Sequence, residues 1–485
     1  MKKILAFALA FLLTASLTCT ALAEGFTFNW DSDDNTAPHC KSLLLLNLDT
    51  GNVVYAMNPD EQLPMASLTK IMSYIVAYET IPNMETATIT MPQSVDDELS
   101  GTGSSVANMF PGEQFSGLQL LHLMMIPSGN NAALTLAKHV DSLYTSGQIT
   151  AEDGWTPTVT QGSDEYYGNF DPTDYTSSSY FVHLMNEKAK ELGCGHTHFT
   201  NPHGLHNPAH YTTARDMAVI TQYAMTLPSF TEITGTTYYE YTPLNSSDER
   251  YAQTTNRLLT NYEDGGMVYY YPFATGIKTG SLDESGYCLA ASATAYGYTY
   301  VAICLGSPMV DEDGGRISLH GEMLDAASLF RWALTTLEKK TLAVQGEILS
   351  SIKLESAWQK DELQLMAQSN AAVMLPEDVD GTSVVVTTDL PESIEAPVER
   401  GDEIGTAIFS YAGEEIATVP LVAAETVERS EIIRLLNQGR EILTAPWFLL
   451  IVAFIGLLIL VYIVLILVYR RKQRSMRTVR RHRDL

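Results

Sequence analysis

The pattern of apolar and polar positions near the start of the chain predicts a β-hairpin followed by a helix. Two apolar runs, residues 41–48 and 53–57, flank a turn that contains Gly51, which is typical of a hairpin. The next segment has apolar residues at helical spacing, namely Leu68, Ile71, Met72, Ile75 and Val76. The helix predicted there places Ser67 and Lys70 on one face, one turn apart.

Helical and strand-like patterns both continue through the first 340 residues. Ser116 is placed to cap the first of the later helices. Helical periods occupy residues 118–125, 131–140, 181–192 and 323–337. Small and β-branched residues alternate in residues 287–305, which predicts paired strands.

Two stretches interrupt or end this pattern. Residues 146–178 form a polar insert rich in Asp, Thr, Ser, Tyr and Gly, and a loop of this length is usually functional or disordered. From residue 350 the chain is rich in strand-like runs separated by Gly and Asp turns, so we place a domain boundary near residue 341. Residues 427–446 have the pattern of an amphipathic helix.

The two ends of the chain predict export and a membrane anchor. Residues 1–23 combine two lysines, an apolar run and an Ala-x-Ala ending, which is the pattern of a secretory signal peptide. Residues 447–469 contain no charge and, at about 34 Å as a helix, are long enough to span a bilayer. Eight basic residues in the tail, residues 470–485, place that end in the cytoplasm. We therefore expect a single-pass protein of the cell membrane, with its large domain on the extracytoplasmic face.

The charge of the chain narrows the choice of partners. The 485 residues include 57 acidic and 29 basic side chains, a formal net charge of −28. Without the signal peptide and the basic tail, 19 basic and 56 acidic residues remain, and the net charge is near −37. Such a surface repels nucleic acid, so we expect no nucleic-acid partner. The expected contact with the membrane is the C-terminal helix.

Ser67 and Lys70 form an S-x-x-K motif. A serine hydroxyl is a weak nucleophile until a neighbouring base takes its proton. A lysine one turn away can act as that base when burial or another cation lowers its pKa. By composition about one or two such matches arise by chance in a chain of this length, and residues 350–353 provide a second one in a strand-like stretch. The motif alone is therefore weak evidence.

A second motif lies at the predicted break between two helices. Ser128, Gly129 and Asn130 can present a hydroxyl and an amide to a substrate from such a loop. An ordinary turn between helices is the alternative, because these residue types are common in turns.

A third motif is the run Lys278, Thr279, Gly280 and Ser281, which is expected at the mouth of an edge strand. Glycine there allows a substrate backbone to approach closely, and a lysine on a solvated turn is the alternative. The order S-x-x-K, S-x-N, K-T-G is the signature of penicillin-binding proteins and class A β-lactamases. Together the three motifs make the ordinary explanations untenable.

The sequence resembles the low-molecular-mass penicillin-binding proteins, which are serine-type D-alanyl-D-alanine carboxypeptidases. The resemblance runs from about residue 37 to residue 427 and includes residues 201–205 and 210–216 beside the three motifs. Residues 401–405 resemble part of the family's C-terminal β domain. The insert at 146–178 and the full membrane span are departures, since the best-known relatives attach by an amphipathic helix.

The resemblance implies an α/β (α+β) fold. A transpeptidase- or β-lactamase-like domain, in which helices flank an antiparallel sheet, is expected over residues 24–340. A small all-β domain is expected over 341–426, followed by a juxtamembrane amphipathic helix over 427–446 and one C-terminal transmembrane helix.

The resemblance also implies the chemistry. The expected substrate is a peptidoglycan stem peptide ending in D-Ala-D-Ala, β-lactams are expected as covalent inhibitors, and no cofactor is required. Ser67 is the expected nucleophile, Lys70 the base and Ser128 the proton relay. The expected substrate-binding residues are Asn130, Lys278, Thr279, Gly280 and Ser281.

The histidines and cysteines are the candidate metal ligands of the chain. Five histidines crowd into fifteen residues, at positions His196, His198, His203, His206 and His210. No H-E-x-x-H and no acidic ligand at fitting spacing accompanies them, so we expect no metal site. Four cysteines lie outside the signal peptide, Cys40, Cys194, Cys288 and Cys304, and none has metal or C-x-x-C spacing. Isolated buried thiols are the favoured interpretation, although an exported protein can form disulfides.

Two other classes of function remain open. The first is a penicillin-binding sensor that keeps the fold for binding, although a tail of sixteen residues offers no signalling domain. The second is a scaffold whose β domain places partners at the membrane. Release of D-Ala from a small D-Ala-D-Ala peptide distinguishes an enzyme from both.

Overall fold

The structure is a computed structural model. It describes residues 28, 30, 38–161, 163, 170–261, 268–311, 313–377, 379, 383–411, 414–430, 432 and 445–481. The predicted signal peptide and most of the predicted juxtamembrane helix lie outside the described residues.

A five-stranded antiparallel sheet forms the centre of the first part of the chain, with the strand order β2-β1-β9-β8-β7. Its strands are β1 (Ser42–Asn47), β2 (Val53–Met57), β7 (Ala274–Leu282), β8 (Gly286–Ala295) and β9 (Tyr298–Ser307). The hairpin and the paired strands predicted from the sequence are confirmed as β1–β2 and β8–β9. Strand β7, which carries the K-T-G motif, lies at one edge of the sheet.

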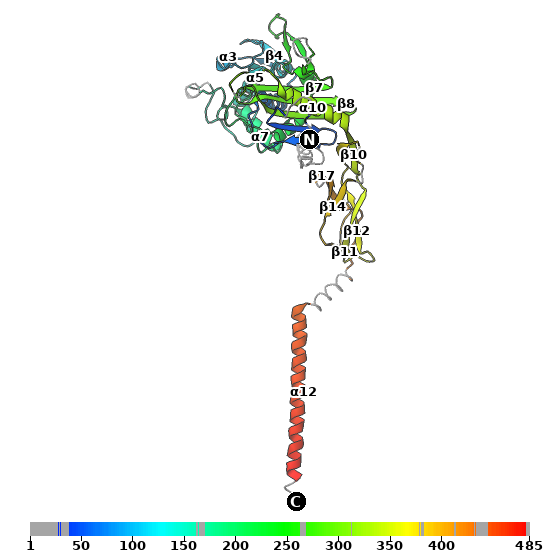
Figure 1. Cartoon of the computed structure of the whole chain (residues 1–485). Helices are drawn as coiled ribbons and strands as arrows, with labels where there is room; N and C mark the ends of the chain where they lie inside the picture. The colour runs from blue at the N-terminus through cyan, green and yellow to red at the C-terminus, as the bar shows by residue number, and fades with distance from the viewer. Residues whose placement is uncertain are drawn as a thin grey trace. The chain divides into compact units, whose positions relative to one another are not determined.

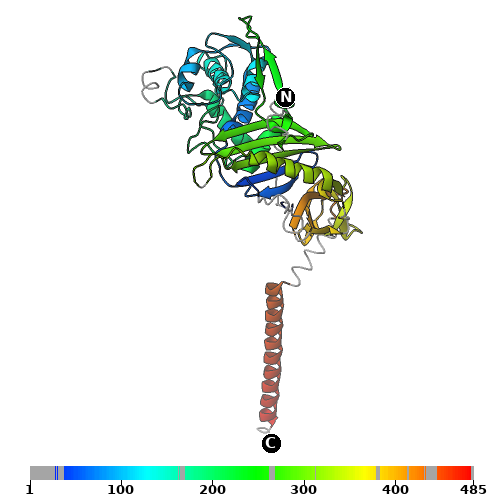
Figure 2. The same cartoon turned by 45° about the horizontal axis from the view of Figure 1, so that its top comes forward.

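Helices cover both faces of this sheet (Figures 1 and 2). Helix α10 (Gly321–Thr336) packs on strands β8 and β9, and helix α8 (Ala214–Ala224) packs on β9 and β1. The strands are apolar on both faces for this reason, and all six residues of β1 are buried.

A helical part adjoins the sheet on the side of α8. Helix α2 (Thr69–Thr80) packs against α4 (Gly117–Met125), α5 (Asn130–Thr145), α7 (Tyr180–Glu191) and α8. Side chains cap several of these helices, as when Ser116 and Gln119 form a capping box at the start of α4. The smaller elements are η1 (Ala66–Leu68), β3 (Thr88–Thr90), α3 (Gln93–Leu99), β4 (Gln114–Ser116), α9 (Phe230–Gly235), β5 (Tyr238–Tyr241), β6 (Arg250–Gln253) and η2 (Arg257–Leu259).

The C-terminal strands form a second, six-stranded sheet with the order β14-β16-β17-β12-β11-β15. These strands are β11 (Ile348–Glu355), β12 (Glu362–Ala367), β14 (Val385–Asp389), β15 (Ser393–Glu395), β16 (Glu403–Tyr411) and β17 (Glu414–Ala423). Strands β10 (Leu337–Ala343) and β13 (Ala371–Pro376) pair with each other. The chain divides into two compact units, and the first contains residues up to Leu342 together with Ala372–Val385 and Phe409–Ala417. The domain limits expected from the sequence stay a prediction.

The last helix, α12 (Pro446–Arg481), contains the predicted span. Its segment Pro446–Arg471 has a mean hydropathy of 3.4 over its most apolar window, and none of that window is buried against the protein. A helix this long and apolar, exposed over its most apolar window, fits a bilayer span.

Candidate active site

Ser67 lies in the short 3-10 helix η1, directly before α2. The prediction that Ser67 and Lys70 share one face is confirmed, because Lys70 Nζ lies 2.8 Å from Ser67 Oγ. Ser67 is partly exposed, whereas Lys70 is fully buried. A partly exposed hydroxyl is thus paired with an amine shielded from water.

Lys70 has two further contacts besides Ser67. Its Nζ donates to Asn130 Oδ1 at 2.6 Å and to the backbone oxygen of His203 at 2.7 Å. Burial holds the pKa of Lys70 well below its ordinary value, and the neighbouring Lys278 cation lowers it further. A neutral amine has two N–H donors and one lone pair. The two carbonyl oxygens can take the donors, which leaves the lone pair for the Ser67 hydroxyl.

Ser128 lies at the break between α4 and α5 with a backbone φ of +62°, and 5% of it is exposed. This left-handed conformation turns the chain sharply, so that Asn130 begins α5 and its side chain reaches Lys70. The backbone N–H of Asn130 donates to the backbone oxygen of Ser105 at 2.8 Å. The loop before β4 therefore lies against the S-x-N motif.

Lys278 lies in the middle of strand β7 and is 1% exposed. Burial lowers the pKa of its amine to about 7, and the amine donates to the backbone oxygen of Thr279 at 2.8 Å. The Thr279 hydroxyl in turn lies 2.5 Å from the hydroxyl of Thr255. The Lys278 cation lowers the pKa of Lys70, so the two side chains lie close enough to interact electrostatically. The structure therefore brings the first and third motifs together.

Gly280 allows strand β7 to approach the nucleophile. A Cβ added at Gly280 would lie 3.0 Å from the Met65 oxygen and 3.1 Å from the Ser67 amide nitrogen, so any other residue would push the strand away. Ser281 follows as an exposed residue of the same strand.

The loop that contains His203 is fitted closely to η1. Gly204 has a φ of +93°, and a Cβ there would lie 2.0 Å from the backbone oxygen of Ala66. Asn201 holds the loop by accepting from the Gly204 amide at 2.7 Å and donating to the Leu205 oxygen at 2.9 Å. These contacts fix the position of the His203 carbonyl that binds Lys70.

Two of the crowded histidines, His210 and His198, have hydrogen-bond partners of their own. His210 Nε2 lies 2.7 Å from Thr69 Oγ1, and burial lowers the pKa of His210 to about 3, so the ring is neutral. His198 Nδ1 lies 2.6 Å from the Ala209 oxygen. No group of three His, Cys, Asp or Glu side chains in the described part of the chain is arranged to hold a metal ion. The four cysteines are buried and free.

Two contacts at the site were missed in the sequence. The His203 contact uses a backbone oxygen, and residues 201–205 enter the sequence analysis only as part of the family resemblance. Thr255 follows strand β6 and has no motif around it, so no sequence signal identifies its contact with Thr279. The roles of the residues that the sequence selected stay predictions.

Comparison with known proteins places this site in a family. Residues 31–144 and 175–309 match the peptidase S11 family, described as D-alanyl-D-alanine carboxypeptidase. Residues 337–429 match the C-terminal domain of penicillin-binding protein 5. The unmatched stretch between the first two segments, 145–174, falls almost wholly within the insert at 146–178.

Curated relatives and solved structures agree with this match. D-alanyl-D-alanine carboxypeptidase DacF of Bacillus subtilis is 28% identical over 404 residues, which cover 83% of this chain and 89% of the relative. DacC of Escherichia coli is 27% identical over 399 residues, covering 80% of this chain and 84% of the relative. Penicillin-binding protein 5 from Haemophilus influenzae has the same fold, with a TM-score of 0.60 at 23% identity over 81% of this chain and 99% of that chain.

The fold and the site define a serine peptidase, which is a hydrolase. Because the family match covers more than half of its residues, the chain belongs to the D-alanyl-D-alanine carboxypeptidase family. The expected resemblance to the low-molecular-mass penicillin-binding proteins is confirmed. The expected fold class, with helices around an antiparallel sheet, an all-β domain and one apolar C-terminal helix, is confirmed as well.

Proposed function

We propose that this protein removes the terminal D-Ala from peptidoglycan stem peptides through an acyl-enzyme on Ser67. The observation that carries the proposal is the buried Lys70 amine 2.8 Å from the Ser67 hydroxyl, in a chain of this family. A neutral amine at that distance is within reach of the hydroxyl proton.

Acylation begins when Lys70 takes the proton of Ser67 and Oγ attacks the carbonyl carbon of the penultimate D-Ala. The backbone N–H groups of Ser67 and Ser281 hold the resulting oxyanion. Ser128 passes a proton to the departing nitrogen, the C–N bond breaks, and free D-Ala leaves. The rest of the stem peptide remains as an ester on Ser67.

Deacylation reverses these roles with water as the nucleophile. Lys70 takes a proton from the water, the hydroxide attacks the ester carbonyl, and the Ser67 oxygen leaves with a proton. The same amide hydrogens hold the second oxyanion. The reaction needs only acid, base and hydrogen-bond donors, so no cofactor enters it.

Recognition of the substrate rests on the third motif. Protonated Lys278 attracts the terminal carboxylate and the Thr279 hydroxyl donates to it, while Gly280 leaves room for the peptide backbone. Asn130 holds the peptide through its amide. β-Lactams enter the same site as acylating mimics of the substrate. The protein is held by helix α12 in the membrane, with the catalytic domain on the extracytoplasmic face and the basic tail in the cytoplasm.

The test is turnover by the full-length protein in detergent, measured as D-Ala released from an N-acylated tripeptide ending in D-Ala-D-Ala. The proposal requires multiple turnovers that stop in Ser67→Ala. Penicillin binding without any release of D-Ala would indicate a sensor. Neither binding nor release, in a folded protein, would indicate a scaffold.

A further inference from the structure

Within the described part of the chain, the hairpin of strands β5 and β6 has one largely buried face and one exposed face. The register pairs Tyr238 with Gln253 and Glu240 with Tyr251, so these four side chains point to the same side. All four side chains are exposed. We call Tyr238, Glu240, Tyr251 and Gln253 the outer face.

Two tyrosines dominate the outer face. The rings of Tyr238 and Tyr251 stack at a centroid distance of 5.4 Å and an interplanar angle of 23°. They are 44% and 62% exposed, so a broad aromatic surface faces solvent. Glu240 lies on the same face, directly opposite Tyr251 in the strand register. Exposed aromatic surface of this kind, flanked by polar groups, marks a binding surface rather than a folding core.

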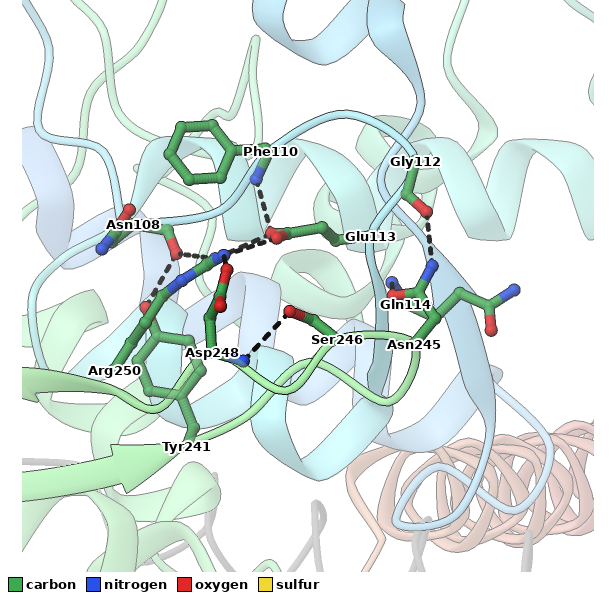
Figure 3. A network of polar contacts seen from close by, with 10 residues as sticks. All are labelled: Asn108, Phe110, Gly112, Glu113, Gln114, Tyr241, Asn245, Ser246, Asp248 and Arg250. Carbon is green, nitrogen blue, oxygen red and sulfur yellow. Dashed lines mark hydrogen bonds and ion pairs between the residues drawn. The ribbon is translucent and has the colours of Figure 1, made fainter.

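The opposite face of the hairpin is fixed to the loop before β4 (Figure 3). The Arg250 guanidinium donates to both oxygens of Glu113, at 2.6 and 2.8 Å, and to the Asn108 oxygen at 3.0 Å. The Tyr241 hydroxyl donates to the same Asn108 oxygen at 2.8 Å, and Asn245 Nδ2 donates to the Gly112 oxygen at 2.9 Å. The hairpin is thereby held rigidly, which lowers the entropy lost when its outer face binds a ligand.

The hairpin and its supporting loop both lead to the active site. Two residues beyond Gln253, the hydroxyl of Thr255 lies 2.5 Å from that of Thr279 in the K-T-G motif. The supporting loop meets the S-x-N motif, since the Ser105 oxygen accepts from the Asn130 amide. The strand that carries Tyr251 therefore leads, within a few residues, to a contact with the K-T-G motif.

We propose that the outer face of the β5–β6 hairpin is a carbohydrate-binding site for the amino-sugar glycan to which the stem peptide is attached. This inference rests on the proposed function, because it assigns a place to the part of that substrate that does not react. The site takes a neutral pyranose whose ring lies against Tyr251 and Tyr238, with hydroxyl and amide groups bound by Glu240 and Gln253.

The chemistry of the outer face fits a sugar. The C–H groups of a pyranose carry a slight positive charge and pack against the negative face of an aromatic ring. The Glu240 carboxylate accepts from hydroxyl groups, and the Gln253 amide both donates and accepts. The chain carries a net charge of −28, so a neutral polyhydroxyl group is a part of the substrate that it can hold without like-charge repulsion.

The length of the peptide fits as well. Thr255 lies four positions after Tyr251, and four residue steps span at most about 14 Å when extended. Three extended peptide residues, between the acylated D-Ala and the sugar, span about 10 Å. A sugar bound at Tyr251 can thus be joined to a peptide whose D-Ala-D-Ala end lies at Thr279 and Ser67.

The experiment compares two substrates with the full-length protein in detergent. One is a stem peptide without sugar, and the other is the same peptide on its disaccharide. Tyr251→Ala should lower kcat/KM for the disaccharide substrate about five- to tenfold, through KM, and change that for the free peptide less than twofold. Tyr251→Trp, which keeps an aromatic face, should restore the preference. Tyr296→Ala is the matched control, because Tyr296 is 71% exposed but lies in the turn between β8 and β9.

Each outcome decides the question. Equal losses on both substrates would mean that the hairpin only supports the fold, and no loss on either would mean that the glycan binds elsewhere. Either result overturns the proposal. A second measurement follows binding of the peptide-free disaccharide to Ser67→Ala by saturation-transfer NMR, which should disappear on adding Tyr238→Ala and Tyr251→Ala. If the wild type releases no D-Ala from either substrate, the proposed function fails, while this binding measurement still judges the carbohydrate site.

Discussion

Lys70 Nζ lies 2.8 Å from Ser67 Oγ, and the same nitrogen contacts two carbonyl oxygens that cannot donate to it. Two N–H groups of the amine are enough for these two carbonyl oxygens. To accept the proton of Ser67, the amine must carry a lone pair in place of its third proton. An arginine at this position keeps the charge and never becomes neutral, because its pKa is above about 12.

Lys70→Arg should therefore lower the rate of acylation by about 10²–10⁴-fold while the protein stays folded. The rate is measured by labelling with a fluorescent penicillin. Ser67→Ala should abolish labelling completely, and Ser350→Ala, in the chance S-x-x-K match, should leave it unchanged. Labelling that persists in Ser67→Ala contradicts the assignment of the nucleophile.

The low pKa of Lys278 predicts the alkaline limit of activity. Burial lowers this pKa to about 7, so the cation is present below pH 7 and is lost as the pH rises above it. We expect kcat/KM for a free-acid substrate to fall above that pH, since kcat/KM reports ionisations of the free enzyme. A C-terminal amide substrate, which has no carboxylate to bind, should show a flatter profile.

Substitution at Lys278 also tests whether its cation binds the substrate carboxylate. Lys278→Ala should lower kcat/KM about 10²-fold on the acid and much less on the amide. Lys278→Arg should move the alkaline limit to higher pH, because the guanidinium keeps its proton. Equal losses on acid and amide would assign Lys278 to proton transfer or folding instead of carboxylate recognition.

Gly204 and Gly297 form a matched pair of glycines. They test whether close contact between the His203 loop and η1 is needed for activity. Both have positive φ, +93° and +86°, so alanine costs about 1–2 kcal/mol of backbone strain at either position. Only Gly204 has Ala66 and Ser67 within reach of a new Cβ, whereas nothing lies within 4 Å at Gly297. Gly204→Ala should lower kcat at least about tenfold, and Gly297→Ala should change only the melting temperature. A similar loss of kcat in both variants argues that strain, and not contact with η1, is responsible.

Asp141 predicts a pH dependence of stability. It is buried on α5, where it accepts from Ser179 Oγ, the Phe181 amide and Gln161 Nε2, and burial raises its pKa to about 6. Between the ordinary value of 3.8 and about 6, the folded protein binds more protons than the unfolded chain. The contribution of Asp141 to the free energy of unfolding should therefore fall across this window as the pH rises, by about 3 kcal/mol.

Asp141→Asn removes this titration and provides the measurement. The difference in unfolding free energy between wild type and variant, from denaturant titrations between pH 4 and 8, should change across pH 4–6 and be constant above it. Other carboxylates titrate in both proteins and cancel. A difference that is constant over the whole range means that Asp141 does not titrate there.

Helix α12 is expected to supply location and no chemistry, because its most apolar window is not buried against the protein. A protein truncated after Ala445 should be soluble and should retain kcat/KM within about twofold. Activity is measured on the free peptide, with the full-length protein in detergent as reference. A folded but inactive truncated protein shows that the membrane helix contributes to the site.

The sequence by itself determined that Ser67 and Lys70 meet, and also that the chain has one long apolar helix near its C-terminal end. Ser67 and Lys70 are three residues apart, and at that separation the helical period alone sets which side chains meet. The long helix depends only on a continuous apolar run. The family resemblance likewise rested on short local motifs, whose residue types and order are readable without knowing the fold.

Only the tertiary structure decided how the motifs meet. The His203 carbonyl lies 133 residues from the Lys70 that it binds, and a backbone oxygen leaves no mark in a side-chain pattern. Thr255 meets Thr279 because strand β6 leads into a turn beside β7, which no local spacing encodes. The low pKa values of Lys70 and Lys278 arise from burial, and burial is a property of how distant segments pack. The outer face of the β5–β6 hairpin is likewise defined only by the strand register. The register places Tyr238 and Tyr251 on one side of the hairpin and Arg250 on the other.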